Sequence, residues 1–228
     1  MRKEFVGNVS HELRTPLTVM RGYIETLQDS PDNTQVVERA FEQMANQVDR
    51  MQALADDLIL LSRLEAEGPV AKLERVNLYQ LLATIVAEAE VLSGGVHKLT
   101  LTCPDSLEVG SQGDSLRSAF GNIVFNAVRH NPKGATVDIQ AQQFADNITV
   151  SIKDDGVGID AAEVPRITER FYRGDNSRNS STGGTGLGLA IVKHSLNQCG
   201  GDLSISSRLG YGATFICRLP VVTHQPKK

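Results

Sequence analysis

The sequence predicts two units of different fold class, an all-α helical hairpin followed by an α+β sandwich. In two long segments near the N-terminus, apolar residues recur every three or four positions, which is the spacing of amphipathic helices. From about residue 75, short alternating or apolar runs typical of strands are interleaved with helical segments. We expect the hairpin to span 1–67, a linker 68–74, the sandwich 75–222 and a tail 223–228.

The first predicted helix, 2–28, has an apolar face and a polar one. When successive residues are placed about 100° apart around the helix axis, one face is apolar and contains Phe5, Val9, Leu13, Leu17, Met20, Ile24 and Leu27. His11 falls on the opposite face, beside Glu12 and one turn before Thr15. Pro16 cannot donate to the carbonyl of Glu12, so we expect a bend there. A lone helical histidine is usually a solvated surface residue, and the pattern alone leaves its role open.

The second predicted helix, about 34–66, follows a turn signal at Ser30-Pro31-Asp32-Asn33. Its apolar positions have the spacing of a coiled coil and are Val37, Phe41, Met44, Val48, Met51, Leu54, Leu58 and Leu61. Two helices with such long apolar faces cannot bury them as one hairpin. We therefore expect a dimer whose two hairpins form a four-helix bundle. The alternative is a hairpin that packs on its own second domain.

The second unit begins after Gly68-Pro69, which ends the second helix. We expect helices near 78–86, 115–130 and 187–199, and strands near 99–102, 136–140, 148–153, 203–206 and 214–219. This mixture predicts a sheet covered by helices on one face.

Composition narrows the functional classes. The 228 residues are 40% hydrophobic and 22% charged, and the net charge of −4 disfavours a direct nucleic-acid partner. Cys103, Cys199 and Cys217 contain no CxxC pair, which favours reduced thiols over a disulfide framework or a zinc site. No apolar run approaches the roughly 18 residues of a membrane-spanning helix.

Four further segments could bind a ligand. In the first, Asn122, Asn126, Arg129 and His130 lie opposite the apolar face of a helix. An amide oxygen suits Mg²⁺ and a guanidinium suits phosphate, although a polar solvent-facing surface would look the same. The second segment is Asp154-Asp155-Gly156-Val157-Gly158. Its carboxylate could accept a hydrogen bond from an exocyclic amine, or the segment could be an ordinary Asp-Gly turn.

The third segment, Glu169-Arg170-Phe171-Tyr172-Arg173, is either a packed loop anchor or a means of bringing a cation to a phosphate. The fourth, Gly183 to Leu189, opens an apolar helix, and backbone amides at a helix N-terminus bind phosphate. It is neither a dinucleotide-binding fingerprint nor a Walker loop, and the protein Ser/Thr kinase signatures are missing from the sequence.

These strings together resemble a known family. Ser-His-Glu-Leu-Arg-Thr-Pro resembles the phospho-acceptor box of sensor histidine kinases, and the four segments resemble, in order, the N, G1, F and G2 boxes of the Bergerat ATP-binding fold. Gly210-Tyr-Gly212 resembles the final glycine box. The resemblance implies that His11 attacks the γ-phosphate of ATP, that Glu12 is a general base and that Thr15 assists dephosphorylation of the partner.

The resemblance also implies ATP and Mg²⁺ as cofactors. It makes Asn126 the magnesium ligand with support from Asn122, lets Asp154 bind adenine, and brings Arg129 and Arg173 to the phosphates. The remaining implied ATP-binding residues are His130, Gly156, Gly158, Gly184, Thr185, Gly186, Leu187 and Gly188. His130 stands where many members have tyrosine. The stretch 161–185 would be a mobile lid over ATP.

The implied partners are a second copy of the chain and the receiver domain of a response regulator. Leu116-Arg-Ser-Ala and Thr168-Glu-Arg-Phe-Tyr-Arg resemble the phosphate-regulon branch of the family, which implies the regulator of that system. Because the chain begins almost inside the phospho-acceptor box, we expect the cytoplasmic portion of an inner-membrane sensor, attached to the membrane only through upstream segments. Two alternatives remain, a Bergerat ATPase without histidine chemistry and a dimeric scaffold that only binds nucleotide.

Overall fold

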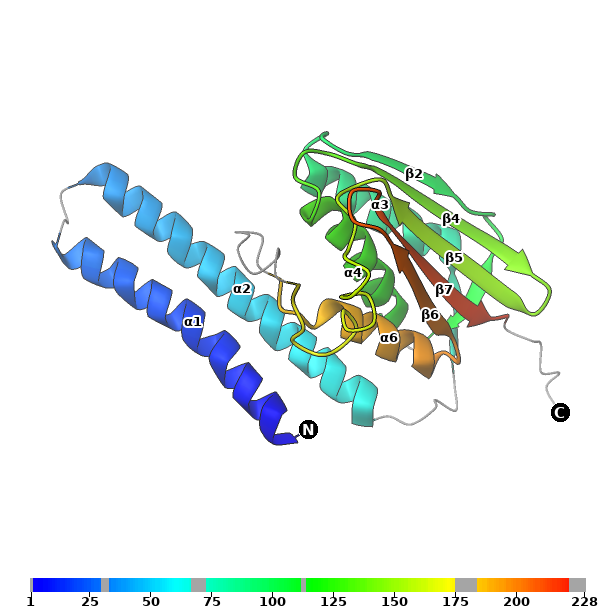
Figure 1. The fold of residues 1–228 in the computed structure, drawn as a ribbon, viewed down its shortest axis with the longest axis horizontal. Coiled ribbons are helices and arrows are strands. Elements are labelled where there is room, and N and C mark those ends of the chain that lie inside the picture. Colours follow the sequence, from blue (N-terminus) through cyan, green and yellow to red (C-terminus); the bar gives the residue numbers. More distant parts are fainter. Residues whose placement is uncertain (1, 30–32, 67–72, 112–113, 175–183, 222–228) are drawn as a thin grey trace.

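A computed structural model describes residues 2–29, 33–66, 73–111, 114–174 and 184–221 of the chain. It consists of a long helical hairpin lying beside a unit of sheet and helices (Figure 1). Both predicted fold classes are therefore confirmed. Among the described residues, none of the helices combines the length and apolar character that crossing a bilayer requires.

The hairpin consists of α1 (Arg2–Asp29) and α2 (Thr34–Ala66), as the apolar spacing predicts. α1 continues as one helical element through Pro16, where we expected a bend. The turn that joins the helices and the Gly68-Pro69 linker signal lie outside the described residues, apart from Asn33. Asn33 accepts, through its side chain, a hydrogen bond from the Val36 amide at the start of α2.

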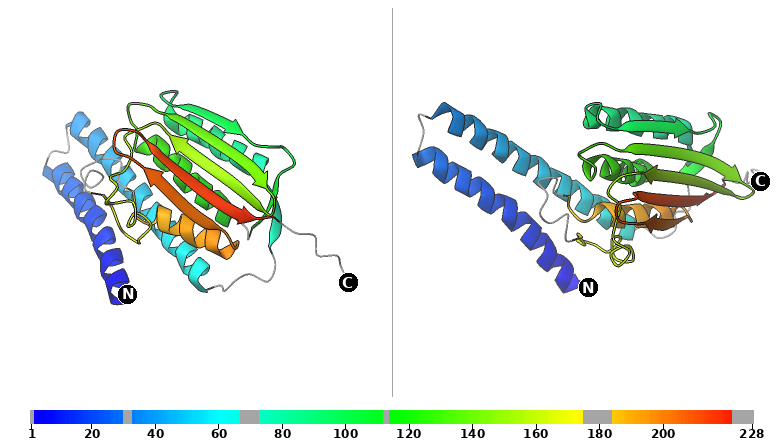
Figure 2. Two further views of the ribbon diagram at one scale, coloured as in Figure 1. Left: turned by 45° about the vertical axis from the view of Figure 1, so that its right-hand side comes forward. Right: turned by 45° about the horizontal axis from the view of Figure 1, so that its top comes forward.

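The sandwich contains a five-stranded sheet in the order β2-β4-β5-β7-β6. Its strands are β2 (Lys98–Thr102), β4 (Thr136–Phe144), β5 (Asn147–Asp154), β6 (Asp202–Ser207) and β7 (Ala213–Pro220). β2 runs parallel to β4, and the other pairs are antiparallel. The helices α3 (Leu78–Ser93), α4 (Ser115–Arg129) and α6 (Gly188–Gln198) cover one face of this sheet (Figure 2).

Sequence patterns missed a second sheet, formed by β1 (Glu74–Asn77) and β3 (Glu108–Ser111). Each strand has only four residues, too few to show the alternation that identifies a strand. β1 starts at Glu74, the last residue of the predicted linker. Asn77 then caps α3 by accepting a hydrogen bond from the amide of Gln80 at 2.9 Å.

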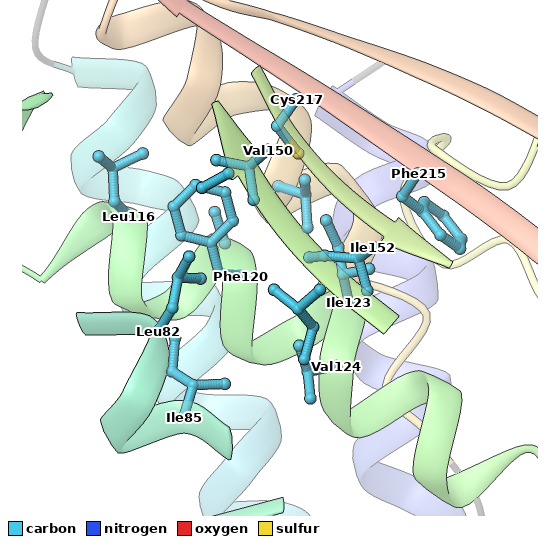
Figure 3. Packing of buried hydrophobic residues seen from close by; sticks show 14 of the residues in the cluster. Leu82, Ile85, Leu116, Phe120, Ile123, Val124, Val150, Ile152, Phe215 and Cys217 are labelled. Atoms are coloured by element: carbon cyan, nitrogen blue, oxygen red, sulfur yellow. The ribbon is translucent and has the colours of Figure 1, made fainter. Parts of the chain in front are cut away.

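The main core fills the space between the sheet and its helices (Figure 3). Phe120 and Ile123 of α4 are fully buried, and they face a sheet whose β5 residues alternate between buried and more exposed positions. Burying one such side chain stabilises the fold by about 1.5 to 3 kcal/mol. Because this apolar face fixes the orientation of α4, the polar residues of α4 are held at the edge of the core.

A second, smaller cluster joins the hairpin to the sandwich. Leu54, Leu61 and Leu64 of α2 are buried against Leu187 and Ile191 at the start of α6. The hairpin thus packs partly on its own second domain, the arrangement considered above as the alternative. The hairpin also keeps an uncovered apolar surface, which comprises Leu17 and Ile24 of α1 and Phe41 and Val48 of α2.

Candidate functional site

His11 lies on the exposed side of α1, as the helical spacing predicts. Thr15 follows one turn later, and its hydroxyl donates to the carbonyl of His11 at 3.2 Å. The predicted phospho-acceptor is therefore accessible from solvent, with a hydroxyl group beside its own backbone.

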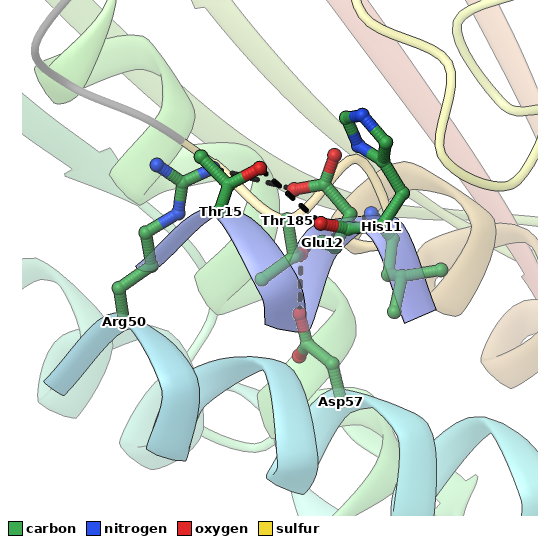
Figure 4. Close-up of polar contacts among 7 residues, drawn as sticks. His11, Glu12, Thr15, Arg50, Asp57 and Thr185 are labelled. Carbon is green, nitrogen blue, oxygen red and sulfur yellow. Dashed lines mark hydrogen bonds and ion pairs between the residues drawn. The ribbon is translucent and has the colours of Figure 1, made fainter. Parts of the chain in front are cut away.

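Glu12, the predicted general base, forms an ion pair across the hairpin. Its carboxylate accepts a hydrogen bond from the guanidinium of Arg50 on α2 at 3.3 Å, and both side chains are about one-quarter exposed. Figure 4 shows Glu12 directed toward Arg50. Sequence reasoning missed Arg50, because a contact between residues 38 positions apart leaves no local signal. Because Arg50 lies on α2, the position of the Glu12 carboxylate beside His11 depends on how α1 and α2 are placed relative to each other.

Asp154, the predicted adenine-binding residue, ends β5 and is only 6% exposed. Its Oδ1 accepts hydrogen bonds from the Gly156 amide at 3.0 Å and from the Asn131 side chain at 3.4 Å. Burial raises the pKa of the Asp154 carboxyl, while hydrogen bonds from Gly156, Ala213 and Asn131 oppose that rise. A buried acceptor at the mouth of a loop can hold an amino group such as the one on adenine.

Asn131, which sequence reasoning did not single out, connects the first two segments. Its buried amide donates to the Ala127 carbonyl at 2.7 Å and accepts from the Val157 amide at 2.8 Å. A Cβ at Gly156 would stand 1.9 Å from the Asn131 Oδ1, so only glycine fits that position. This bond network fixes the loop 155–158 against the C-terminal end of α4.

The predicted magnesium ligand and its neighbours share one side of α4. Asn122 and Asn126 are half-buried, and a Cβ at Gly188 would stand 2.8 Å from the Asn122 Oδ1. This places the start of α6 directly beside α4. Asn126 presents an amide group on this side, and an amide oxygen suits a magnesium ion that keeps several waters.

His130 ends α4 and is surrounded by charge. Loss of water contact, together with the nearby charges of Arg129 and Arg173, lowers the pKa of its imidazole, and Asp154 opposes this shift. Arg129, Arg173 and Asp154 thus lie close enough to His130 for their charges to act on its imidazole.

The glycine-rich loop contacts the hairpin. The Thr185 hydroxyl donates to Asp57 of α2 at 2.7 Å and also accepts from the Leu187 amide at 3.2 Å (Figure 4). Gly186 adopts a left-handed conformation with φ +70°, which a side chain would strain. Leu187, the N-cap residue of α6, makes no side-chain hydrogen bond to the first amides of that helix. These amides can therefore bind an anion, which fits the phosphates of a nucleotide.

The segment 169–173 also faces the hairpin. Phe171 donates its amide hydrogen to the Gly186 carbonyl at 2.8 Å, and its ring lies 5.7 Å from that of Phe5. Arg170 forms an ion pair with Glu65 of α2. These contacts support the loop-anchor interpretation for Arg170 and Phe171, while Arg173 lies near His130. Residues 175–183 of the predicted lid lie outside the described residues.

The positions of Arg50 and Asp57 on α2 relate the two parts of the site. Asp57 lies two turns beyond Arg50, which corresponds to about 10 Å along the helix. The glycine-rich loop, which contacts Asp57, therefore lies about two helical turns along α2 from Arg50 and its partner Glu12. The structure brings the predicted nucleotide-binding residues together in the sandwich and holds that unit against the hairpin that carries His11.

Comparison with known protein families gives two adjacent matches. Residues 1–67 match the His Kinase A (phospho-acceptor) domain. Residues 111–223 match the histidine kinase-, DNA gyrase B- and HSP90-like ATPase family. Both matches agree with the order of units derived from the sequence and the structure.

Curated relatives include the phosphate regulon sensor protein PhoR of Pseudomonas aeruginosa, which is 47% identical over 95% of this chain and 49% of its own length. The sensor histidine kinase WalK of Bacillus subtilis is 35% identical over 98% of this chain and 37% of its own length. The chain thus spans about half the length of the first relative and a smaller share of the second.

Similar solved structures include the histidine kinase ThkA in complex with the response regulator TrrA, with a TM-score of 0.77, 19% identity and coverage of 96% of this chain and 61% of that one. Acinetobacter baumannii histidine kinase AdeS has a TM-score of 0.71, 22% identity and coverage of 93% and 98%. At these identities, the likeness establishes the fold alone.

Proposed function

The chain belongs to the sensor histidine kinases, and on this premise we propose that it transfers the γ-phosphoryl group of ATP to the imidazole of His11. One observation carries the proposal. An exposed histidine on α1 and a glycine-rich loop suited to phosphate occur in one chain, and the loop already contacts the hairpin through Thr185 and Asp57. The match of residues 1–67 to a phospho-acceptor domain disfavours an ATPase without histidine chemistry.

In the proposed reaction, a ring nitrogen of neutral His11 attacks the γ-phosphorus, and the bond to the bridging oxygen breaks to release ADP. Only a ring nitrogen that carries no proton has the lone pair that this attack needs. Glu12 orients the other ring nitrogen and takes up its proton. Arg129, Arg173 and the amides at the start of α6 stabilise the charge on the phosphates. Mg²⁺, held through Asn126, would neutralise phosphate charge when bound.

We propose that phosphohistidine then donates its phosphoryl group to an aspartate of a response-regulator receiver domain. The name of the 47% identical relative favours a phosphate-regulon, PhoB-like regulator. Thr15, one turn from His11, would help water remove the phosphate from the regulator. Thr15→Ala should therefore slow regulator dephosphorylation and spare autophosphorylation.

We further propose that the uncovered apolar surface of α1 and α2 forms a four-helix bundle with a second copy. The proposed units are the hairpin at 1–67, a linker at 68–74, the catalytic unit at 75–222 and a tail. From the similarity to a phosphate regulon sensor protein, we also propose that the chain acts as the cytoplasmic portion of a membrane-attached sensor.

The test is labelling with γ-³²P-ATP and Mg²⁺, followed by alkali and acid treatment. A phosphoramidate survives base and is lost in acid. We expect His11→Gln to abolish base-stable label while ATP binding persists, and His194→Gln to serve as a control that keeps the label. Base-stable label in His11→Gln would reject His11 as the acceptor. A wild-type chain that binds ATP without acquiring label would support the scaffold alternative.

A further inference from the structure

We infer that the Asp57 carboxylate is an internal anion that competes with the phosphates of a bound nucleotide for the hydroxyl of Thr185. Phosphate binding would then weaken the contact between the glycine-rich loop and α2, and that contact would weaken phosphate binding. The inference rests on the proposed function, because it takes Thr185 and Arg129 as phosphate-binding groups.

The first argument is the hydrogen bond itself. The Thr185 hydroxyl has one proton, and it donates that proton to Asp57 at 2.7 Å. While this bond is formed, the hydroxyl cannot also donate to a phosphate oxygen. Apolar contacts of Leu187 and Ile191 with α2 hold the loop on the hairpin. Asp57 competes with phosphate only while the loop lies in this position.

The second argument is charge. Asp57 is half-buried, and desolvation raises the pKa of its carboxyl, as does the neighbouring charge of Asp56. The hydrogen bond from Thr185 and the positive charge of Arg129 favour its ionised form. These two favourable partners on the sandwich are the groups to which we assign phosphate binding. Desolvation is the largest influence, so the pKa of Asp57 is raised overall, and Thr185 and Arg129 are the groups beside it that favour an anion.

The third argument is the consequence of adding a nucleotide. Phosphates placed near Thr185 and Arg129 would bring like charge close to a carboxylate in partly dehydrated surroundings, where repulsion is stronger than in water. Either the phosphates bind more weakly or the loop leaves α2. A kinase built in this way would separate its loop from Asp57 when the phosphates bind, which frees the catalytic unit to move relative to His11.

The experiment compares the wild-type chain with Asp57→Asn and the matched control Asp56→Asn. Asparagine has the shape of aspartate, and its Oδ1 still accepts the Thr185 proton, so Asp57→Asn removes the charge and keeps the contact. Asp56 is the exposed neighbour of Asp57, and its side chain accepts a hydrogen bond from Gln52. Affinities for AMP, ADP and ATP with Mg²⁺ are measured by displacement of a fluorescent ATP analogue.

We expect Asp57→Asn to bind ATP roughly 3- to 10-fold more tightly than wild type, with a smaller gain for ADP and little change for AMP. Asp56→Asn should bind all three nucleotides almost as wild type does. Asp57→Ser, a second variant without the carboxylate, should repeat the order of gains. Circular dichroism confirms that each variant is folded.

Three outcomes would overturn the inference: equal ATP affinity in wild type and Asp57→Asn, a gain of the same size for AMP as for ATP, or weaker ATP binding after the charge is removed. Failure of the proposed function has a different signature, because it is read from the wild type alone: the wild type would then bind no ATP, or would bind ATP without acquiring base-stable label.

Discussion

The two ends of the proposed nucleotide site are held in different ways. At the adenine end, Asp154, Asn131 and Gly156 bond to one another within the sandwich. At the phosphate end, Thr185 and Leu187 contact the hairpin instead. Folding of the sandwich alone is therefore enough to form the adenine end. The contacts of the phosphate end depend, in addition, on the position of α2.

Local packing agrees with this division. A Cβ at Gly158 would stand 2.2 Å from the Arg208 carbonyl oxygen, and one at Gly212 would stand 2.0 Å from that of Asp154. The loops around Asp154 are thus packed with no spare room. At Gly184, by contrast, no heavy atom of the described residues lies within 4 Å of a built Cβ. Among the described residues of the glycine-rich loop, Gly184 thus has open space around it, whereas Gly186 and Gly188 are closely packed.

The largest expected effect comes from filling the adenine end. In Gly156→Ala, the new methyl group would collide with the Asn131 side chain, 1.9 Å away, which must then leave Val157 and Ala127. We expect a loss of about 3 kcal/mol of unfolding free energy. Urea denaturation measures this loss, and calorimetry should detect no heat of ATP binding.

Gly184→Ala is the matched control at the phosphate end. It adds the same methyl group where there is open space, and its unfolding free energy should stay within about 0.5 kcal/mol of wild type. Equal destabilisation by the two substitutions would show that both ends are equally packed and would remove the basis of the comparison.

An intermediate effect is expected where the phosphate end meets the hairpin. Leu61 of α2 is 1% exposed in the small cluster with Leu187 and Ile191, and Leu61→Ala should weaken that contact by about 2 kcal/mol. Amide hydrogen exchange at the start of α6 should then accelerate, while exchange in β5 stays slow. The control is Ile59→Ala, whose side chain is 53% exposed on the same helix. Faster exchange in β5 would contradict separate control of the two ends.

The same division explains what the sequence could predict. Periodicity placed the two hairpin helices, α4, α6 and all five strands of the large sheet to within a few residues, whereas α3 continues to Ser93, well past the predicted 78–86. The short strands β1 and β3 were missed because four residues carry too little pattern. Local motifs indicated Asp154, Asn126 and the glycine-rich loop as site residues.

The missed residues act over long sequence separations. Asn131 reaches Val157 across 26 positions, Arg50 reaches Glu12 across 38, and Thr185 reaches Asp57 across 128. Such contacts exist only after the units have packed, so no local pattern could indicate them. Contacts between the hairpin and the sandwich are accordingly the part of the site that only the structure reveals.

The smallest expected effect is a pH dependence of stability from the adenine end. Burial raises the folded-state pKa of Asp154 above the unfolded value of 3.8, despite its hydrogen bonds, so the folded state holds this proton more tightly. As the pH falls from 7 toward that raised pKa, wild type should gain stability relative to Asp154→Asn, and the gain should level off below 3.8. The lowered pKa of His130 acts in the opposite direction, but His130 is present in both proteins.

Urea denaturation between pH 7 and 4 measures the difference, with Asp146→Asn, an exposed position after β4, as the control. A difference that shrinks as the pH falls would mean that hydrogen bonding, and not burial, dominates at Asp154, and that the adenine end is built to keep its carboxylate charged.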